Sequence, residues 1–152
     1  MKKSVSLFIV FTLVVIALTG CGRAADEKLC RIEIVDSNQN VISIMENQSQ
    51  SDISEFFDET QWKESEKPID NPVTKYVISV YQEKTKTVVK TDSDDYEKIM
   101  EYVIFENSEI VKVSIGGDVV NGMVPDELFD EYYIASSDFF SRINDIAATN
   151  TI

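Results

Sequence analysis

The sequence predicts an α+β fold: an antiparallel β-sheet with two main helices packed on one face of it. Three observations lead to this prediction. They are a strand-hairpin pattern over residues 30–45, a run of strand patterns from 74 to 134, and amphipathic helix patterns at 51–57 and 136–146. Because strands joined by short turns pair in the antiparallel sense, the sheet is expected to be antiparallel. We expect a single domain over residues 29–152, a usual domain length.

The first hairpin is predicted from alternation of apolar and charged residues. In the segment that starts at Cys30, the side chains of Cys30, Ile32 and Ile34 share one face and are expected to point inward. A polar turn over 36–40 joins this strand to a second strand over 41–45. The inward position favours Cys30 as a small buried apolar residue, with a redox-active or intermolecular thiol as the alternative.

A helix is expected to begin at Ser51, whose side chain suits an N-cap. Asp52 and Glu55 then lie near the positive end of the helix dipole. The apolar face of this helix is expected to be formed by Ile53, Phe56, Phe57 and Trp62. Pro68 and the Asn71-Pro72 pair are expected to end the helical segment.

The central strands are indicated by β-branched and aromatic residues. The clearest is Thr74–Tyr81, and residues 86–90 are its expected hairpin partner. Further strands are expected at 102–105, 109–115 and 132–134.

Two helical predictions remain. Residues 92–100 are ambiguous and could form a short helix capped by Ser93. A C-terminal helix is expected to begin at Ser136 or Ser137. Its inward side chains are expected to be Phe139, Phe140, Ile143 and Ile146.

The charge balance limits the possible partners. The chain has 14 Lys and Arg against 27 Asp and Glu, a formal net charge of −13. Lys2 and Lys3 are the only charged residues among the first 20, so the rest of the chain carries 12 basic and 27 acidic residues, or −15. Such a surface repels nucleic acid, and it attracts cations, basic peptides and basic proteins. A solvated acidic surface that maintains solubility explains the same charge.

The chain contains no histidine. This excludes Ser-His-Asp and Cys-His hydrolases and histidine-ligated zinc sites. The sequence also lacks Ser-x-x-Lys, Cys-x-x-Cys and a glycine-rich phosphate loop. Paired carboxylates could support glycoside hydrolysis without histidine, but nothing in the sequence selects a pair. We therefore expect a protein that is not an enzyme.

The N-terminus has the pattern of an export signal. Lys2 and Lys3 precede an uncharged apolar stretch from Val5 to Leu18. As a helix this stretch spans about 21 Å, which is short of the bilayer core of about 30 Å. A signal-peptide h-region therefore explains it better than a permanent transmembrane helix.

The apolar stretch ends in Leu18-Thr19-Gly20-Cys21. These residues resemble the lipobox of bacterial lipoprotein signal peptides. The resemblance implies cleavage between Gly20 and Cys21 and a diacylglycerol thioether on Cys21. Apart from this covalent lipid, we expect no cofactor. Two acyl chains are sufficient for stable membrane anchoring. The expected organisation is a signal peptide over 1–20, a lipidated tether over 21–28, and an extracytoplasmic domain held at the cell membrane.

The order of the predicted elements is similar to that of small, poorly characterised lipoproteins of Gram-positive bacteria. This likeness covers residues 29–148 and depends on topology, without a diagnostic motif. Since no chemistry is assigned to those families, it implies no site residues. The residue after Cys21 is Gly22, so an aspartate retention signal is absent at that position.

Three acidic segments are weak candidates for cation binding. Asp36, Asn38 and Asn40 resemble the start of an EF-hand loop, but Val41 replaces the required glycine and Asn47 the bidentate glutamate. A polar hairpin turn is therefore the preferred interpretation of that segment.

The other two candidates are short runs of carboxylates. Asp92, Asp94 and Asp95 lie within four residues, which favours a hard cation such as calcium, although helix capping explains them equally well. The Asp126-Glu127 and Asp130-Glu131 pairs are a weaker signal of the same kind.

The preferred functional hypothesis is a non-catalytic, membrane-anchored module of the cell envelope. It is expected to bind a protein, a peptide or wall material through a sheet face or edge. A calcium- or cation-binding lipoprotein is the first alternative, and a small carboxylate-based hydrolase is the second.

Overall fold

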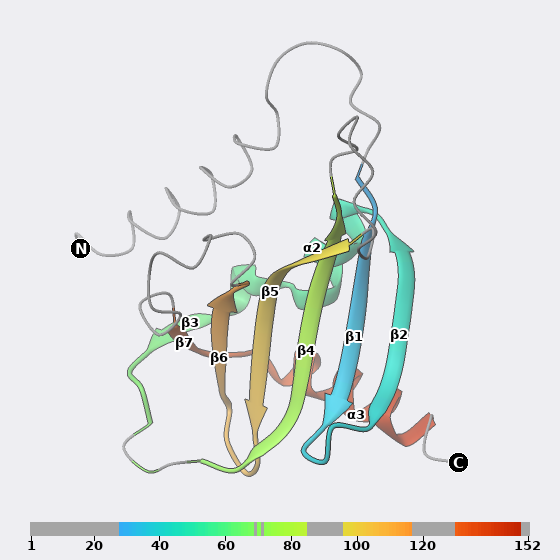
Figure 1. Cartoon of the computed structure of the whole chain (residues 1–152). Coiled ribbons are helices and arrows are strands. Elements are labelled where there is room, and N and C mark those ends of the chain that lie inside the picture. The colour runs from blue at the N-terminus through green and yellow to red at the C-terminus, as the bar shows by residue number, and fades with distance from the viewer. Residues whose placement is uncertain (1–27, 69, 71, 85–95, 117–129, 150–152) are drawn as a thin grey trace, which may run out of the picture.

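The computed structural model describes residues 28–68, 70, 72–84, 96–116 and 130–149. Within these residues lie seven strands, two α-helices and one 3₁₀ helix (Figure 1). In chain order they are β1 (Cys30–Asp36), β2 (Val41–Gln48), α2 (Gln50–Phe57), η1 (Glu59–Gln61), β3 (Lys63–Ser65), β4 (Thr74–Glu83), β5 (Tyr96–Phe105), β6 (Ile110–Ile115), β7 (Glu131–Ile134) and α3 (Ser137–Thr149).

The strands form one sheet in the order β2-β1-β4-β5-β6-β7-β3. Each neighbouring pair in this sheet is antiparallel. The predicted combination of an antiparallel sheet and two helices, an α+β fold, is therefore confirmed. The strand patterns at 30–34, 41–45, 74–81, 102–105 and 132–134 all lie within observed strands, and the one at 109–115 coincides with β6 except at Glu109.

Strand register divides the sheet residues between two faces. Ile32 pairs with Val80 and Ile34 with Ile78, and these side chains are buried, as is Cys30. We call the side of the sheet that carries them the core face. Its other buried residues include Tyr102, Ile104 and Val111, which belong to one apolar cluster with Phe57 of α2 and Phe139 and Ile143 of α3. The predicted inward positions of β1 are therefore confirmed.

Aromatic rings join the helices to the strands. Phe57 stacks on Tyr102, with ring centroids 4.0 Å apart and 16° between the planes. Phe139 contacts Trp62 edge to face at 4.9 Å. Nη1 of Arg142 donates to the backbone carbonyl of Glu55 at 2.7 Å, which links α3 to α2. Offset and edge-to-face ring pairs stabilise a core beyond the area they bury.

The start of α2 differs from the prediction. Ser49, not Ser51, is the N-cap: its hydroxyl accepts a bond from the backbone N–H of Asp52 at 3.2 Å. The Asp52 carboxylate in turn accepts a bond from the backbone N–H of Ser49 at 2.8 Å. This reciprocal capping box satisfies two N–H groups, whereas a cap at Ser51 would leave them without partners. The helix ends at Asp58, in the left-handed region at φ 45°, well before Pro68.

The sequence left residues 92–100 ambiguous, with a short helix as one possibility. Residues 96–100 form the first half of β5 instead. The expected hairpin partner at 86–90 lies outside the described residues, as does Ser93. Within the described residues, β4 is paired with β1 on one edge and with β5 on the other. The short strand β3, which pairs with β7, was not predicted.

The C-terminal helix agrees with its prediction. The hydroxyl of Ser136 accepts a bond from the backbone N–H of Phe139 at 3.4 Å, so Ser136 acts as the cap. Phe139 and Ile143 are buried, and Phe140 and Ile146 pack against the core in part. Neither of the described helices is long and apolar enough to cross a bilayer.

Candidate functional site

The edge strand β2 exposes two apolar side chains. Ile44 pairs with Glu33, and Val41 pairs with Val35. Between Ser43 and Val41 the register shifts, and Ile42 is the additional residue of this bulge. The bulge brings Val41 and Ile44 to the same side of the sheet although three positions separate them. Val41 is 53 % exposed and Ile44 51 %.

The outer edge of β2 has no pairing partner among the described strands. Natural edge strands are commonly protected by lysine, by proline or by being very short. β2 has eight residues and contains no lysine, arginine or proline; its one charged residue is Glu46. The opposite edge, β3, has three residues, of which Lys63 and Glu64 are charged and exposed. Of the two edges, β2 is therefore the better template for an additional strand.

The side of the sheet opposite the core face is polar at its centre. We call it the polar face. One row across it contains Glu33, Ser79, Glu101 and Ser114. Lys98 forms an ion pair of 2.6 Å with Glu101.

Arg31 occupies the next position of β1 on the polar face. Its guanidinium lies 4.7 Å from the ring centre of Tyr81 and 5.1 Å from that of Tyr96. Two aromatic rings thus hold the cation at the end of the sheet where β1 begins.

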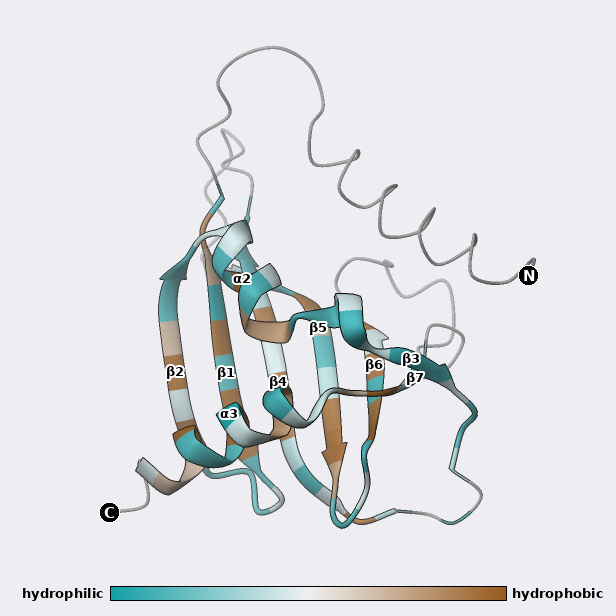
Figure 2. Cartoon of the chain, turned by 180° about the vertical axis from the view of Figure 1, so that it is seen from behind, coloured by the Kyte–Doolittle hydropathy of each residue, from teal (hydrophilic) through white to brown (hydrophobic). Residues whose placement is uncertain are grey.

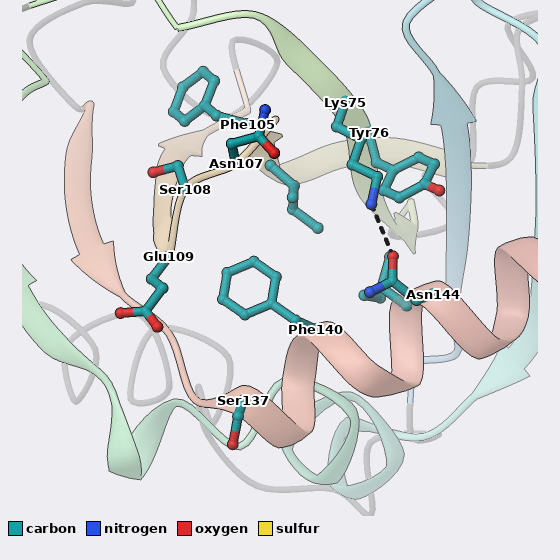
Figure 3. A pocket seen from close by; sticks show the side chains of 11 residues that line it. Lys75, Tyr76, Phe105, Asn107, Ser108, Glu109, Ser137, Phe140 and Asn144 are labelled. Carbon is teal, nitrogen blue, oxygen red and sulfur yellow. Dashed lines mark hydrogen bonds between the residues drawn. The ribbon is translucent and has the colours of Figure 1, made fainter.

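A pocket of about 430 Å³ lies at the other end of the sheet, between α3 and the β5–β6 turn (Figure 3). Its lining combines polar and apolar groups, as ligand sites generally do. The residues that line it are Lys75, Tyr76, Ile104, Phe105, Asn107, Ser108, Glu109, Ser137, Phe140, Ile143 and Asn144. They come from three parts of the chain that are far apart in sequence.

Lys75 is the cation of this pocket. Its Nζ donates a hydrogen bond to Oδ1 of Asn144 at 2.9 Å, drawn as the dashed line in Figure 3. The same Nζ lies 5.0 Å from the ring centre of Tyr76. Figure 3 also shows the Phe140 ring extending from α3 toward the centre of the pocket. The ammonium group is thus oriented by two uncharged groups.

The segment from Asp36 to Asn40, which resembles the start of an EF-hand loop, is a polar hairpin turn, and this confirms the preferred interpretation. Oδ1 of Asp36 accepts bonds from the backbone N–H groups of Asn38 and Asn40 at 2.8 and 2.9 Å. Oδ2 accepts a bond from Nδ2 of Asn40 at 2.9 Å. These bonds hold the pKa of the Asp36 carboxyl below its usual value, the side-chain bond from Asn40 contributing most. Val41 begins β2, so the carboxylate closes the turn between β1 and β2.

The other predicted site residues are placed as follows. Gly20, Cys21, Asp92, Asp94, Asp95, Asp126 and Glu127 lie outside the described residues. The carboxylate of Asp130 accepts bonds from Oγ of Ser114 at 2.6 Å and from Nζ of Lys112 at 3.3 Å. Glu131 accepts a bond from the hydroxyl of Tyr133. In the part of the chain that the structure describes, no group of three or more carboxylate or thiol side chains could hold a metal ion.

Cys30 is a buried free thiol. Burial raises its pKa, and this effect outweighs the bond with Gln82 that lowers it. A raised pKa disfavours the nucleophilic thiolate at neutral pH. The prediction of a small buried residue is confirmed.

The sequence did not predict that the residues of this pocket come together. It also did not predict the hydrogen bond of 2.6 Å that the hydroxyl of Tyr102 donates to Oε1 of Glu59. The available signal was slight: Lys75 is the one charged residue of the strand pattern Thr74–Tyr81, and Phe140 is adjacent to the inward Phe139. No protein-family model, no curated protein and no solved structure matches this chain.

Proposed function

We propose that this protein is a non-catalytic, lipid-anchored module on the extracytoplasmic face of the cell membrane, and that it binds an extended basic segment of another envelope protein along β2. The observation that carries the binding role is the eight-residue edge strand β2, whose outer side pairs with no described strand and which exposes Val41 and Ile44 on one side. Extended peptides add to such edges through backbone hydrogen bonds, and alternate side chains supply specificity.

The anchor is supported by the lipobox residues Leu18 to Cys21. From Cys21 the chain reaches the described domain at Lys28, and seven residues extend at most about 25 Å. Such a tether would keep the Cys30 end of β1 near the membrane. Because the strands are antiparallel and in register, that end also carries Gln82 and Glu97, whereas Asp36 and Tyr76 lie at the far end.

The nature of the partner segment follows from the charges and the register. Val41 and Ile44 favour β-branched residues opposite them, since such cross-strand pairs stabilise sheets. Glu46, two residues beyond Ile44, favours a lysine or arginine. The charge of −15 beyond the signal segment would accelerate the approach of a basic partner and would oppose pairing of two copies of this chain.

The binding role is tested with two synthetic peptides, acetyl-Lys-Thr-Val-Thr-Val-amide and the same peptide with glutamate in place of lysine. Full-length protein in lipid nanodiscs is titrated while backbone amide signals of β2 are followed by NMR. The lysine peptide is expected to shift signals of 41–46, and the glutamate peptide to bind more weakly. Ile44→Lys should weaken binding of the lysine peptide, because it removes an apolar contact and adds like charge.

Ile134→Lys is the matched control. Ile134 is 39 % exposed on β7 and therefore tolerates the same substitution away from β2. Equal effects of the two variants, or shifts outside β2, would reject the edge as the binding site. The anchor is tested separately by intact-mass measurement: Cys21→Ser should abolish lipidation and processing, and Cys30→Ala should leave both intact.

We further propose that α2 and α3 cover the same face of the sheet, the core face. Support comes from the apolar cluster shared by Phe57, Phe139 and Ile143 with the strands and from the bond between Arg142 and Glu55. The view in Figure 2, in which both helices lie in front of the strands, agrees with this arrangement. The polar face would then be available together with the β2 edge.

A further inference from the structure

We propose that the pocket between α3 and the β5–β6 turn binds a small amphipathic monocarboxylate, meaning an apolar body that carries one carboxylate group. This site is separate from the β2 edge, and the inference does not depend on the anchor or on strand addition. The chemistry that would recognise the ligand consists of one lysine, several apolar side chains and a few hydroxyl and amide groups.

The contacts of Lys75 indicate that the ligand carries a carboxylate. In the described residues the two ion-paired lysines, Lys98 and Lys112, contact carboxylates. Lys75 instead contacts the neutral amide of Asn144 and the face of Tyr76. An ammonium group has three N–H donors, and the bond to Asn144 uses one of them. Lys75 is thus held in position with donor capacity and a positive charge available to an anion.

The apolar side chains that line the pocket indicate that the rest of the ligand is apolar. Ile104, Ile143 and Phe140 line the pocket, and Phe140 extends toward its centre (Figure 3). A volume of about 430 Å³ is within the range of small-molecule sites. Ser108 and Ser137 provide hydroxyls for a polar group such as an amide. An apolar side chain next to a carboxylate, as in an acylated amino acid or the C-terminal residue of a peptide, matches this lining.

The presence of Glu109 in the pocket indicates that the ligand carries only one carboxylate. This glutamate lines the same pocket as Lys75 but forms no ion pair with it. A second carboxylate on the ligand would be repelled by Glu109 and would have no second cation of the lining to contact. Dicarboxylates are therefore expected to bind more weakly than monocarboxylates.

Under the proposed anchoring at Cys21, the position of the pocket suits a ligand from outside the cell, although binding itself does not depend on the anchor. Asp36 of β1 pairs with Tyr76, whereas Cys30 pairs with Gln82, so the pocket lies at the end of the sheet away from the N-terminal tether. Six residue steps of an extended strand separate these two ends by about 20 Å. The opening is thus distant from the point where the chain leaves for Cys21.

The test uses full-length protein in lipid nanodiscs with labelled isoleucine methyl groups. N-acetyl-phenylalanine is the probe, and its amide and phenylsuccinate are the comparison ligands. Titration of the probe is expected to shift the methyl signals of Ile104 and Ile143 and to leave those of Ile32 and Ile44 unchanged. The amide is expected to bind at least about tenfold more weakly, because it loses a charge-assisted bond. A tripeptide ending in phenylalanine, with and without a C-terminal amide, distinguishes a peptide end from a free acid.

Variants of the lysine and its partner complete the test. Lys75→Met should weaken binding of the probe at least about tenfold, whereas Lys75→Arg should retain most of it. Asn144→Asp is close to isosteric and places a carboxylate beside Lys75, so it should weaken binding while the domain stays folded. Lys63→Met removes an exposed lysine on β3 and should change nothing. Equal affinity for acid and amide, full affinity in Lys75→Met, or no shift up to about 10 mM probe would overturn the proposal.

Discussion

The hydroxyl of Tyr102 donates a hydrogen bond of 2.6 Å to Oε1 of Glu59, and the Tyr102 ring stacks on that of Phe57. Glu59 belongs to the 3₁₀ helix and Tyr102 to β5, so this contact joins segments 43 residues apart. Burial raises the pKa of Glu59, and the bond from Tyr102 lowers it by less. Burial and the neighbouring Glu59 carboxylate also raise the pKa of Tyr102. Tyr102 therefore stays protonated and remains the donor.

This contact predicts how stability depends on pH. Because the pKa of Glu59 is raised on folding, its contribution to stability is fully present below its unfolded pKa and is lost as pH rises through the folded pKa. Glu59→Gln keeps the acceptor oxygen and removes the ionisation. The free energy of unfolding of this variant, relative to wild type, should increase as pH rises through that window. Denaturant unfolding from about pH 4 to about pH 8 measures it, with exposed Glu66→Gln as a control that should show no such increase.

The capping box of α2 predicts a difference between two nearby serines. Ser49→Ala should lower the free energy of unfolding by about 1 kcal/mol, because the N–H of Asp52 loses its acceptor. Ser51→Ala should cost less than about 0.5 kcal/mol, since Ser51 lies inside the helix and its hydroxyl contacts only that of Ser49 in the described residues. Urea unfolding of both variants checks this. The reverse order of effects would show that the helix begins at Ser51.

The register of the sheet predicts unequal effects of one substitution at two positions. Ile34 is fully buried on the core face, so Ile34→Val should lower the free energy of unfolding by about 0.5–1.5 kcal/mol. Ile44 is half exposed on the adjoining strand, and Ile44→Val should change it by less than about 0.5 kcal/mol. Thermal and denaturant unfolding measure both variants. Similar losses at the two positions would contradict the assignment of faces.

The calcium alternative predicts a ligand-dependent stability. A site that binds only the folded protein should stabilise it by about 2.7 kcal/mol at a hundredfold excess over the dissociation constant. If the proposed function is correct, the melting temperature should be the same in millimolar calcium and in EDTA. A stabilisation by calcium that is lost in Asp94→Asn would instead favour a cation site at Asp92, Asp94 and Asp95.

The structure confirms the predicted strands whose pattern of apolar and polar residues is clear within a few consecutive positions. In β1 the alternation of Cys30, Ile32 and Ile34 is sufficient to identify the buried side, because successive side chains of a strand point to opposite faces. Residues 96–100 were ambiguous because their apolar residues suit either period over so short a segment. Pairing with β4 decided in favour of a strand. Likewise, Ser49 and Ser51 both suit an N-cap in this part of the sequence, and only the observed bonds select Ser49.

The sequence by itself determined the fold class, the inward side of the first strand, the C-terminal helix and the absence of histidine chemistry. These follow from periodicity and composition, which act over a few residues at a time. The tertiary structure alone decided that β2 is an edge, that Tyr102 meets Glu59, and that Lys75, Phe140 and Asn144 share a pocket. Such relations depend on which distant segments pair, and pairing is decided by the packing of the whole chain rather than by any local pattern.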